Sequence, residues 1–533
     1  MPGYKDLHEW LNVLDRNKLL VRVTRPIIKE SELAPLVRLQ FRGLLEDQRR
    51  GFVFENVVDS KGRKYEAKVA TSVYASSMLM YALGLNCEPT RDAIAATWNN
   101  AQASPIEPIL VNKGAVQEIV CQGEELSKDG KGLESLPVPV EAPGFSGQIR
   151  TSTHIITKDP KTGIRNMGNY SGHIIGKTTV LWEILHVNHG WLHRQAWKEL
   201  GKKSMPAAIV VGGPPSFFYV AGAKLPYNVD ELAVAGAFAG EPVEMVKCKT
   251  IDLEVPANAE IVVEGLVSTE EVMPGNAFAE YTGYMATEVE YRPVFHVTAV
   301  TSRASPYFVH IMSQFPPSES SKIRQISSEN VYLKFLRDDC KIPGILDVVW
   351  NEISQAQWCV IKVKKINNAQ PWQALYCAAG FEPLYGKYFI TVDEDIDPRD
   401  SDAVTWALGW RVQPVRDMKT ISGRFPGLDV SAYKCDASEE EKRYPGGVGS
   451  SALLIDATIK HPYPPLSLPS SEHMNNALKI WKELGLSELN LRQPWFGYSL
   501  GFWPEHYKKD AELVTRGEHY QVGKRLSEGA KSG

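Results

Sequence analysis

Hydrophobic positions near the start of the chain recur at helical spacing and then give way to short apolar runs. Residues 4–20 therefore predict an amphipathic helix, and residues 31–49 predict a second one. The runs 51–54 and 67–70 predict short strands. Together they predict a small α/β unit that ends near the proline-rich stretch 136–139. The apolar face of the first helix consists of Leu7, Trp10, Leu11 and Leu14.

The middle of the chain is rich in β-branched runs that are separated by glycine, proline and asparagine. One clear helix interrupts them, over residues 230–238, and Gly240 closes it. Strands in this number favour a barrel or a sandwich over a doubly wound sheet. The predicted strands include 154–157, 207–211, 260–264 and 294–297.

From about residue 325 the pattern returns to alternating helices and strands, so the whole chain predicts an α+β protein. Strands are expected at 358–363 and 388–392, and helices at 328–337, 471–485 and 505–523. The acidic run 393–397 follows a strand and is expected to be a solvated strand end. The predicted domains are 1–125, 126–325, 326–470 and a C-terminal helical oligomerisation segment, 471–533.

Charge and hydropathy exclude several classes of protein. The formal net charge of -4 argues against nucleic-acid binding and against a polybasic membrane anchor. No run reaches the roughly 18 apolar residues of a membrane helix. The first twenty residues carry charges throughout, unlike a secretory signal. We therefore expect a cytoplasmic protein without a membrane partner.

The cysteines and glycines carry no recognised motif. The seven cysteines are scattered without a CxxC pair, which disfavours a disulfide framework or a structural zinc site. Gly212 and Gly213 lack the spacing of a dinucleotide-binding loop or a P-loop. The cysteines are Cys87, Cys121, Cys248, Cys340, Cys359, Cys377 and Cys435.

A histidine cluster is the strongest candidate for a metal site that the residues alone indicate. His186, His189 and His193 lie within one short stretch. With nearby amide and carboxylate groups they would form a mixed oxygen and nitrogen set, which suits Mn²⁺, Fe²⁺ or Mg²⁺. The alternative is a hydrogen-bonded polar cluster at strand ends. The amide and carboxylate residues are Asn166, Asp230 and Glu231.

Glu280 is the candidate general acid. Apolar and aromatic residues surround it in the segment 277–284, and removal from water favours the protonated form of a carboxyl group. The alternative is an exposed glutamate in a turn.

Several segments in order along the chain resemble the UbiD-type family of prenylated-FMN-dependent decarboxylases and carboxylases. The resemblance covers almost the whole chain and rests on the order of its motifs. They are Asn166 and the segments 187–191, 225–231, 235–237, 246–248, 252–257, 260–265, 392–397, 455–458 and 494–498.

This resemblance implies an N-terminal α/β domain, a central split β-barrel that binds the flavin, and a C-terminal α/β domain. It also implies an extended C-terminal helix that reaches a neighbouring subunit of a homodimer or homohexamer. The cofactor would be prenylated FMN from a prenyl-flavin synthase, bridged to the protein by Mn²⁺, Fe²⁺ or less favourably Mg²⁺, with K⁺ nearby. The implied metal ligands are Asn166, His189 and Glu231, with His186 as the alternative histidine. Further cofactor contacts would come from Tyr170, Ser171, Asn188 and Pro226.

The chain departs from the family pattern at two positions. Family members carry a glutamate–arginine–glutamate network, but Ser171 stands at the arginine position and Gly275 at that of the first glutamate. Glu280 matches the second glutamate, the proton donor. Ser171 is therefore a candidate catalytic replacement. Other candidates to replace the arginine are Tyr170, His173 and His310.

Without that arginine, another group must position the substrate. We therefore expect a non-oxidative carboxy-lyase that acts on an aromatic acyl-CoA with a ring carboxylate, of the phthaloyl-CoA type, where the CoA part supplies binding energy. One alternative is a decarboxylase of a free phenolic or heteroaromatic acid. Others are a subunit of a multi-subunit aromatic carboxylase and a plain FMN oxidoreductase.

Overall fold

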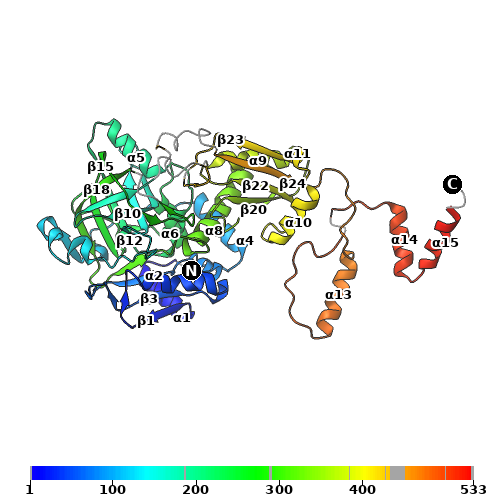
Figure 1. The fold of residues 1–533 in the computed structure, drawn as a ribbon, viewed down its shortest axis with the longest axis horizontal. Coiled ribbons are helices and arrows are strands. Elements are labelled where there is room, and N and C mark those ends of the chain that lie inside the picture. The colour runs from blue at the N-terminus through cyan, green and yellow to red at the C-terminus, as the bar shows by residue number, and fades with distance from the viewer. Residues whose placement is uncertain are drawn as a thin grey trace.

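The molecule consists of a compact body and a C-terminal segment that extends away from it (Figure 1). The computed structural model describes residues 3–184, 188–286, 291–382, 384–426, 428–432, 438, 450–497 and 500–529. His186, Cys435 and Tyr498 lie outside these residues. The N-terminal unit lies against the barrel, and the last sheet lies on the other side of α8, as Figure 1 shows.

The N-terminal unit is a four-stranded sheet with helices. Helix α1 begins after Asp6, whose carboxylate accepts a hydrogen bond from the backbone N–H of Glu9, and it buries the four predicted apolar residues. The predicted helix at 31–49 is shorter than expected, because α2 ends at Gly43. The strand order is β1-β3-β5-β19, and the last strand comes from beyond the barrel. The bounds are α1 Leu7–Arg16, β1 Leu20–Val23, α2 Leu33–Gly43, β3 Gly51–Phe54, β5 Lys68–Thr71, α3 Met78–Gly84, α4 Arg91–Ala103 and β19 Tyr307–His310. A small parallel pair is formed by β2 Ile27–Ile28 and β4 Val57–Val58.

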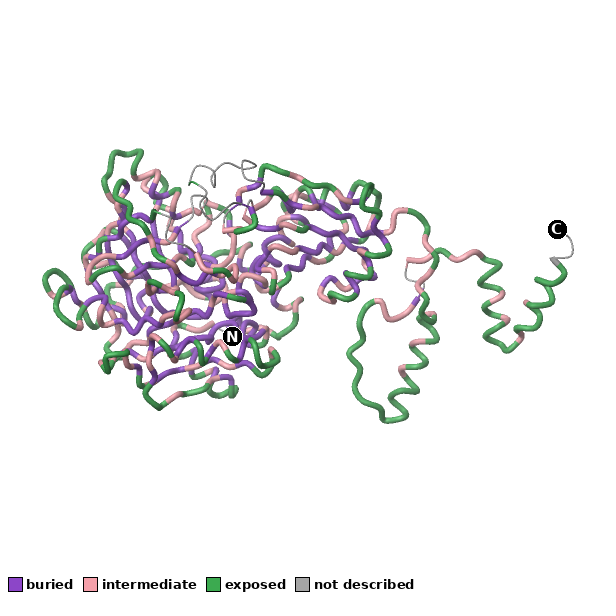
Figure 2. Tube along the Cα trace, viewed as in Figure 1, coloured by how far each residue is buried: buried purple, intermediate pink, exposed green. Residues whose placement is uncertain are grey.

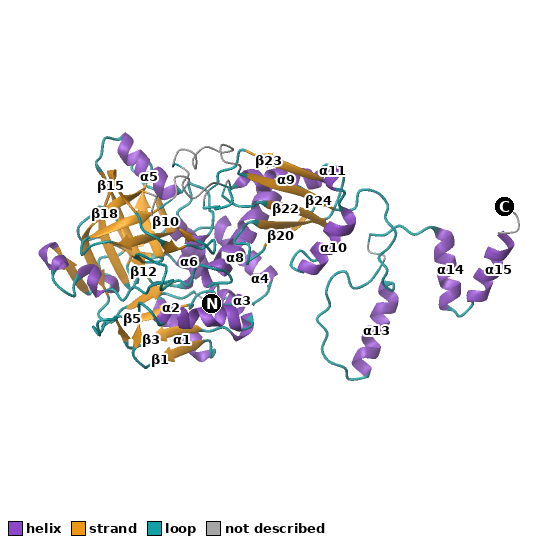
Figure 3. Cartoon of the chain, in the orientation of Figure 1, coloured by secondary structure: helices purple, strands orange, loops and turns teal. Residues whose placement is uncertain are grey.

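The central unit is a closed six-stranded barrel, which confirms the predicted α+β class and selects the barrel over the sandwich (Figure 3). Its strands follow the order β11-β10-β9-β12-β15-β18, and β11 pairs with β18 to close the ring. All four predicted runs coincide with barrel strands, although β15 begins at Ile261, one residue later than predicted. The bounds are β9 Thr153–Lys158, β10 Arg165–Ile174, β11 Thr179–Glu183, β12 Ser204–Val211, β15 Ile261–Pro274 and β18 Tyr291–Ser302. Short strands beside the barrel are β6 Ile109–Leu110, β7 Ile119–Gln122, β8 Ile149–Arg150, β13 Glu244–Lys247, β14 Glu254–Pro256, β16 Phe278–Ala279 and β17 Met285–Ala286.

Four helices pack around the barrel and present their ends to one cavity. Helix α7 is the predicted one: Asp230 caps its start by accepting from the N–H of Leu232, and Gly240 ends it with a left-handed backbone. Helix α6 is buried on every side, so its sequence is apolar without a helical period. The bounds are α5 His189–Glu199, α6 Pro215–Gly222, α7 Glu231–Ala239 and α8 Glu319–Lys334.

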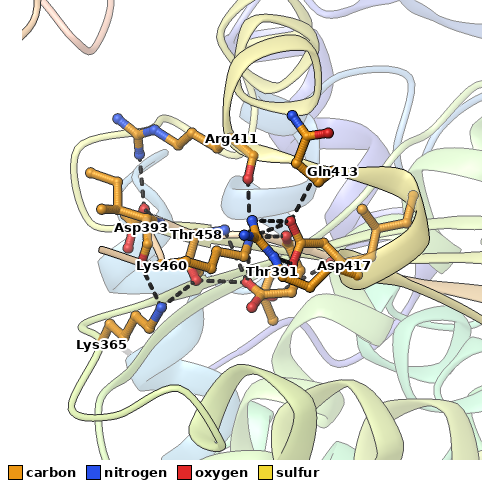
Figure 4. A network of polar contacts seen from close by, with 12 residues as sticks. Lys365, Thr391, Asp393, Arg411, Gln413, Asp417, Thr458 and Lys460 are labelled. Atoms are coloured by element: carbon orange, nitrogen blue, oxygen red, sulfur yellow. Dashed lines mark hydrogen bonds and ion pairs between the residues drawn. The ribbon is translucent and has the colours of Figure 1, made fainter. Parts of the chain in front are cut away.

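The C-terminal unit is a five-stranded sheet in the order β20-β21-β22-β24-β23 with its own core. The acidic run 393–397 is not a solvated strand end, contrary to the prediction. Asp393 and Asp395 are buried and bind Arg411 at 2.9 and 2.7 Å. The pair of Asp393 and Arg411 belongs to the polar network in Figure 4. The bounds are β20 Ile345–Trp350, β21 Trp358–Val363, α9 Gln370–Phe381, β22 Tyr388–Asp393, α10 Ser401–Arg411, α11 Pro414–Asp417, β23 Met418–Ser422 and β24 Ser451–Ala457.

The C-terminal segment is almost wholly exposed (Figure 2). Helix α13 (Ser471–Glu483) has no buried residue. The single helix predicted at 505–523 is wrong: α14 (Glu505–Thr515) and α15 (His519–Gly529) are separate, because Gly517 adopts a left-handed backbone. Among the described residues, no helix is both long enough and apolar enough to cross a membrane.

Candidate active site

A cavity of about 430 Å³ lies between the barrel and the C-terminal unit. One wall comes from β10 and from the first residues of α5 and α7. The opposite wall comes from α8 and from the residues around the end of α9, including Tyr385. The cavity therefore joins residues as far apart in the sequence as Arg150 and Leu428.

The three residues that the resemblance implies as metal ligands line this cavity. Asn166 lies on β10, His189 is the first residue of α5, and Glu231 is the first residue of α7. The hydroxyl of Tyr170 lies 3.5 Å from the amide nitrogen of Asn166 and accepts at 3.4 Å from the N–H of Gly190, the residue after His189. The structure thus brings together three residues that are widely spaced in sequence.

Glu231 is a buried carboxyl group. Burial raises its pKa to about 8, although the backbone N–H of Met167 donates to it at 2.9 Å. No lysine, arginine or histidine forms an ion pair with it among the described residues. A buried carboxylate in this setting is stabilised by a bound cation, so the site fits a metal ion.

His189 is suited to a neutral ligand role. Burial, and secondarily the charge of Lys224, lower the pKa of its imidazole, which keeps a ring nitrogen free of a proton. The described residues hold no group of three His, Cys, Asp or Glu side chains placed for a metal. The set with Asn166 contains only two such residues, and its third ligand would be an amide oxygen.

The remaining histidine and acidic candidates have other contacts. His193 lies on α5 but does not line the cavity; its ring contacts the hydroxyl of Thr157 at 2.9 Å. Asp230 binds Arg165 at 2.7 Å and caps α7. The predicted cofactor contacts that also line the cavity are Tyr170, Ser171, Asn188 and Pro226.

Glu280 is buried and lines the same cavity, so it is not the exposed turn residue of the alternative interpretation. One of its oxygens accepts from the N–H of Tyr281 at 2.7 Å. The other lies 3.4 Å from a guanidinium nitrogen of Arg150. Gly275, the position of the family's first glutamate, is not one of the lining residues.

Arg150 is one of the cavity residues that the sequence analysis missed. It lies on β8, lines the cavity, is buried, and also binds Glu141 at 2.6 Å. Burial alone would raise the pKa of Glu141, but Arg150 and His310 hold it at about 2. Arg150 therefore lies between the carboxylates of Glu141 and Glu280. It comes from a different strand than the one on which the family pattern places its arginine. No spacing motif marks the segment 147–152, so only the fold reveals it.

The other candidates to replace the arginine lie around this pair. His173 and His310 do not line the cavity; the Nε2 atom of His310 lies 3.5 Å from Glu141. His173 packs edge-on against Phe278, with 4.6 Å between ring centres. Ser171 lines the cavity from β10, where it is paired in register with Glu183.

Comparison with known proteins defines the class to which this fold and site belong. Residues 112–316 match the 3-octaprenyl-4-hydroxybenzoate carboxy-lyase Rift-related domain, and residues 325–457 match the C-terminal domain of the same enzymes. An uncharacterised protein of Aquifex aeolicus is 30% identical over 91% of this chain and 99% of its own. The chain therefore belongs to the UbiD family and is an enzyme of the carboxy-lyase class.

Solved structures share this architecture. The UbiD-class enzyme HmfF from Pelotomaculum thermopropionicum, in complex with prFMN, has a TM-score of 0.70 at 26% identity, over 85% of this chain and 95% of that one. Vanillic acid decarboxylase from Sedimentibacter hydroxybenzoicus, in its closed form, has a TM-score of 0.77 at 23% identity, over 91% and 100% of the two chains. The second likeness supports the fold alone.

Proposed function

We propose that this protein is a prenylated-FMN-dependent, non-oxidative decarboxylase of an aromatic or other unsaturated carboxylic acid. One observation carries the proposal: Asn166, His189 and Glu231 line the same cavity as the buried acid Glu280. HmfF, a similar UbiD-class enzyme, is known in complex with prFMN. An anchoring group and a proton donor within one cavity are the two elements that such a reaction requires.

The metal would be held by the amide oxygen of Asn166, an imidazole nitrogen of His189 and the carboxylate of Glu231. This mixed set suits Mn²⁺ or Fe²⁺, and less well Mg²⁺. The cation would neutralise the buried Glu231 and anchor the flavin phosphate, with K⁺ as a second cation. Tyr170 would hold Asn166 and the start of α5 in place through its hydroxyl group.

When bound, prenylated FMN supplies the electron sink for loss of carbon dioxide. The bond between the substrate carbon and its carboxylate breaks, and the electron pair stays on that carbon. Protonated Glu280 then donates its proton to this carbon, which forms the product. Arg150 stabilises the resulting Glu280 carboxylate, and a proton from solvent restores the acid.

The structure removes the main argument for an acyl-CoA substrate. That hypothesis assumed that no arginine was available to hold a carboxylate, but Arg324 lines the cavity and has no carboxylate partner among the described residues. We therefore place a free aromatic acid first and an aromatic acyl-CoA second. A panel of free acids and their CoA thioesters distinguishes the two substrate classes. An enzyme that needs the binding energy of the CoA part fails on the free acids.

The decisive experiment is expression together with a prenyl-flavin synthase, followed by mass spectrometry and absorption spectroscopy of the bound cofactor. We expect a mass matching prenylated FMN and release of carbon dioxide from at least one aromatic acid. Binding of unmodified FMN with consumption of NAD(P)H would contradict the proposal and favour an oxidoreductase. Stable co-purification of a second polypeptide that is needed for turnover would favour the multi-subunit carboxylase.

A further inference from the structure

Three cationic side chains line the cavity, and one of them differs from the others in its partners. Arg150 lies between two carboxylates, and Lys224 lies 3.8 Å from the carboxylate of Glu382. Arg324, on α8, has no carboxylate within ion-pair distance among the described residues. Its positive charge is therefore not neutralised by a direct ionic partner in that part of the chain.

Aromatic residues position Arg324 without neutralising it. The guanidinium lies 3.9 Å from the ring centre of Tyr281, and one nitrogen donates to the hydroxyl of Tyr385 at 3.1 Å. This is its only hydrogen bond within the described residues, and its Nε atom is buried without a partner there. A half-buried guanidinium that faces a cavity with unused donors favours an anionic ligand.

A carboxylate is the anion that best fits this geometry. The planar guanidinium binds the two oxygens of a carboxylate in parallel, and this arrangement is stronger than a single neutral hydrogen bond. The adjacent rings of Tyr281 and Tyr385 also offer faces for an aromatic ring. The environment of Arg324 therefore fits an aromatic carboxylate more closely than an isolated inorganic anion.

The chemistry of decarboxylation decides which carboxylate Arg324 would bind. Tyr281, on which the guanidinium is stacked, directly follows Glu280 in the chain. An arginine that grips the reacting carboxylate stabilises it as an anion and so opposes its loss as neutral carbon dioxide. Binding of a second carboxylate, which the product retains, does not oppose the reaction in this way.

We propose that Arg324 determines substrate specificity by binding a second carboxylate of an aromatic substrate, one that is not lost in the reaction. This inference rests on the proposed decarboxylase function and adds the substrate class: an aromatic dicarboxylate. Arg324 then orients the ring so that the reacting carbon lies beside Glu280. Lys224 and Arg150 are already paired, so neither competes as strongly for that group.

The test compares benzene-1,3-dicarboxylate with benzoate on the holoenzyme. Arg324→Met keeps the aliphatic stem and removes the charge, Arg324→Lys keeps the charge without the planar fork, and Arg337→Met removes an arginine outside the cavity. We expect the ratio of kcat/KM for the dicarboxylate to that for benzoate to fall about 10- to 100-fold in Arg324→Met. Arg324→Lys should retain part of the ratio, and Arg337→Met all of it.

Calorimetric titration of both acids provides a readout that does not depend on turnover. If no acid is decarboxylated but the dicarboxylate still binds through Arg324, the proposed function fails and this inference stands. An unchanged ratio in Arg324→Met, or equal binding of the two acids by the wild type, would overturn it. Loss of the flavin from Arg324→Met would overturn it too, since Arg324 would then hold the cofactor.

Discussion

At the scale of single residues, burial controls the charged groups around the cavity. Arg150, Glu141 and Glu280 are all withdrawn from water, so each depends on the others for compensation. Arg324 is held mainly by aromatic rings. The same buried surroundings thus contain one cation that is neutralised and one whose donors remain largely unused.

Glu280→Gln should abolish most of the turnover while leaving the cofactor in place. The amide keeps the shape of the side chain but cannot donate a proton as a carboxylic acid does, so we expect kcat to fall by about 10²–10⁴. The absorption spectrum of the bound flavin should be unchanged. The control is Glu271→Gln, an exposed residue on β15 that pairs with His296 outside the cavity. Full activity of Glu280→Gln would remove Glu280 from the mechanism.

Arg150→Met should destabilise the protein strongly. Removing the guanidinium leaves two buried carboxylates without their cation, and such a change costs about 3–5 kcal/mol in the free energy of unfolding. Denaturant titration measures it. Arg22→Met breaks a more exposed pair with Asp15 and should cost no more than about 1 kcal/mol. Equal effects of the two changes would show that the Arg150 network contributes little.

The sequence predicted some of the candidate site residues and missed others. Asn166, His189 and Glu231 lie in segments with recognisable order, and all three line one cavity, while their role as metal ligands stays a prediction. Arg150 and Arg324 could not be found in this way. Each lies in a segment without a spacing motif. Arg150 contacts Glu280 and Arg324 contacts Tyr385, and both contacts span more than forty positions of the sequence.

At the scale of elements, the candidate metal site is assembled from the starts of two helices and one strand. His189 and Glu231 each occupy the first helical position, where backbone N–H groups have no partner within the helix. Residue 166 lies near the start of β10. Rigid elements therefore fix all three side chains, which favours a preformed site.

Glu231→Gln should weaken metal binding. Glutamine keeps a group that accepts from the N–H of Met167 but loses the charge that a divalent cation would neutralise. We expect Mn²⁺ to bind at least about tenfold more weakly, measured by titration and by a smaller rise of Tm on adding the metal. Glu199→Gln, at the exposed end of α5, should bind as the wild type does. Unchanged affinity in Glu231→Gln would exclude this residue as a ligand.

His154, on β9, should make the stability of the barrel depend on pH. Burial lowers its pKa to about 4, below the unfolded value near 6.5. The unfolded chain therefore binds a proton first, so stability is full above pH 6.5 and falls as the pH drops toward 4. The loss attributable to this group is about 3 kcal/mol. His154→Gln should show a smaller decrease over this range in denaturant titrations; an identical decrease would assign the effect to other groups.

Periodicity predicted the elements that have one solvated face and failed for the others. Helix α1 shows a clear pattern because one of its sides is solvated. Strand β9 is buried on both faces, and its β-branched composition rather than a period predicted it. Helix α6 is buried all round, and its run of apolar residues has no period to detect. The break between α14 and α15 depends on the backbone of one glycine within an otherwise helical pattern.

At the scale of the whole molecule, the C-terminal segment has apolar side chains but no core. Ile480, Trp481 and Leu484 are exposed on or just after α13. A segment of this kind gains stability only by packing against another surface. We therefore propose that it contacts a second copy of the chain, as the predicted homodimer or homohexamer requires.

Ile480→Glu combined with Leu484→Glu should reduce this association. The charges would enter the proposed interface, while the folded body should be unaffected, since α13 contributes no buried residue to it. Light scattering measures the mass, and circular dichroism checks the fold. Exchange of the polar neighbours, Lys479→Glu with Glu483→Lys, is the matched control. A wild-type mass for the apolar variant would exclude this face from the interface.

The origin of β19 governs how the N-terminal sheet forms during synthesis. Residues 307–310 are its edge strand, parallel to β5, although every other strand of that sheet is complete by residue 71. Until more than three hundred residues have been translated, β5 presents an open edge that can pair with another nascent chain. The N-terminal unit is thus begun before the barrel and completed after it, because its final strand follows the last barrel strand in the chain.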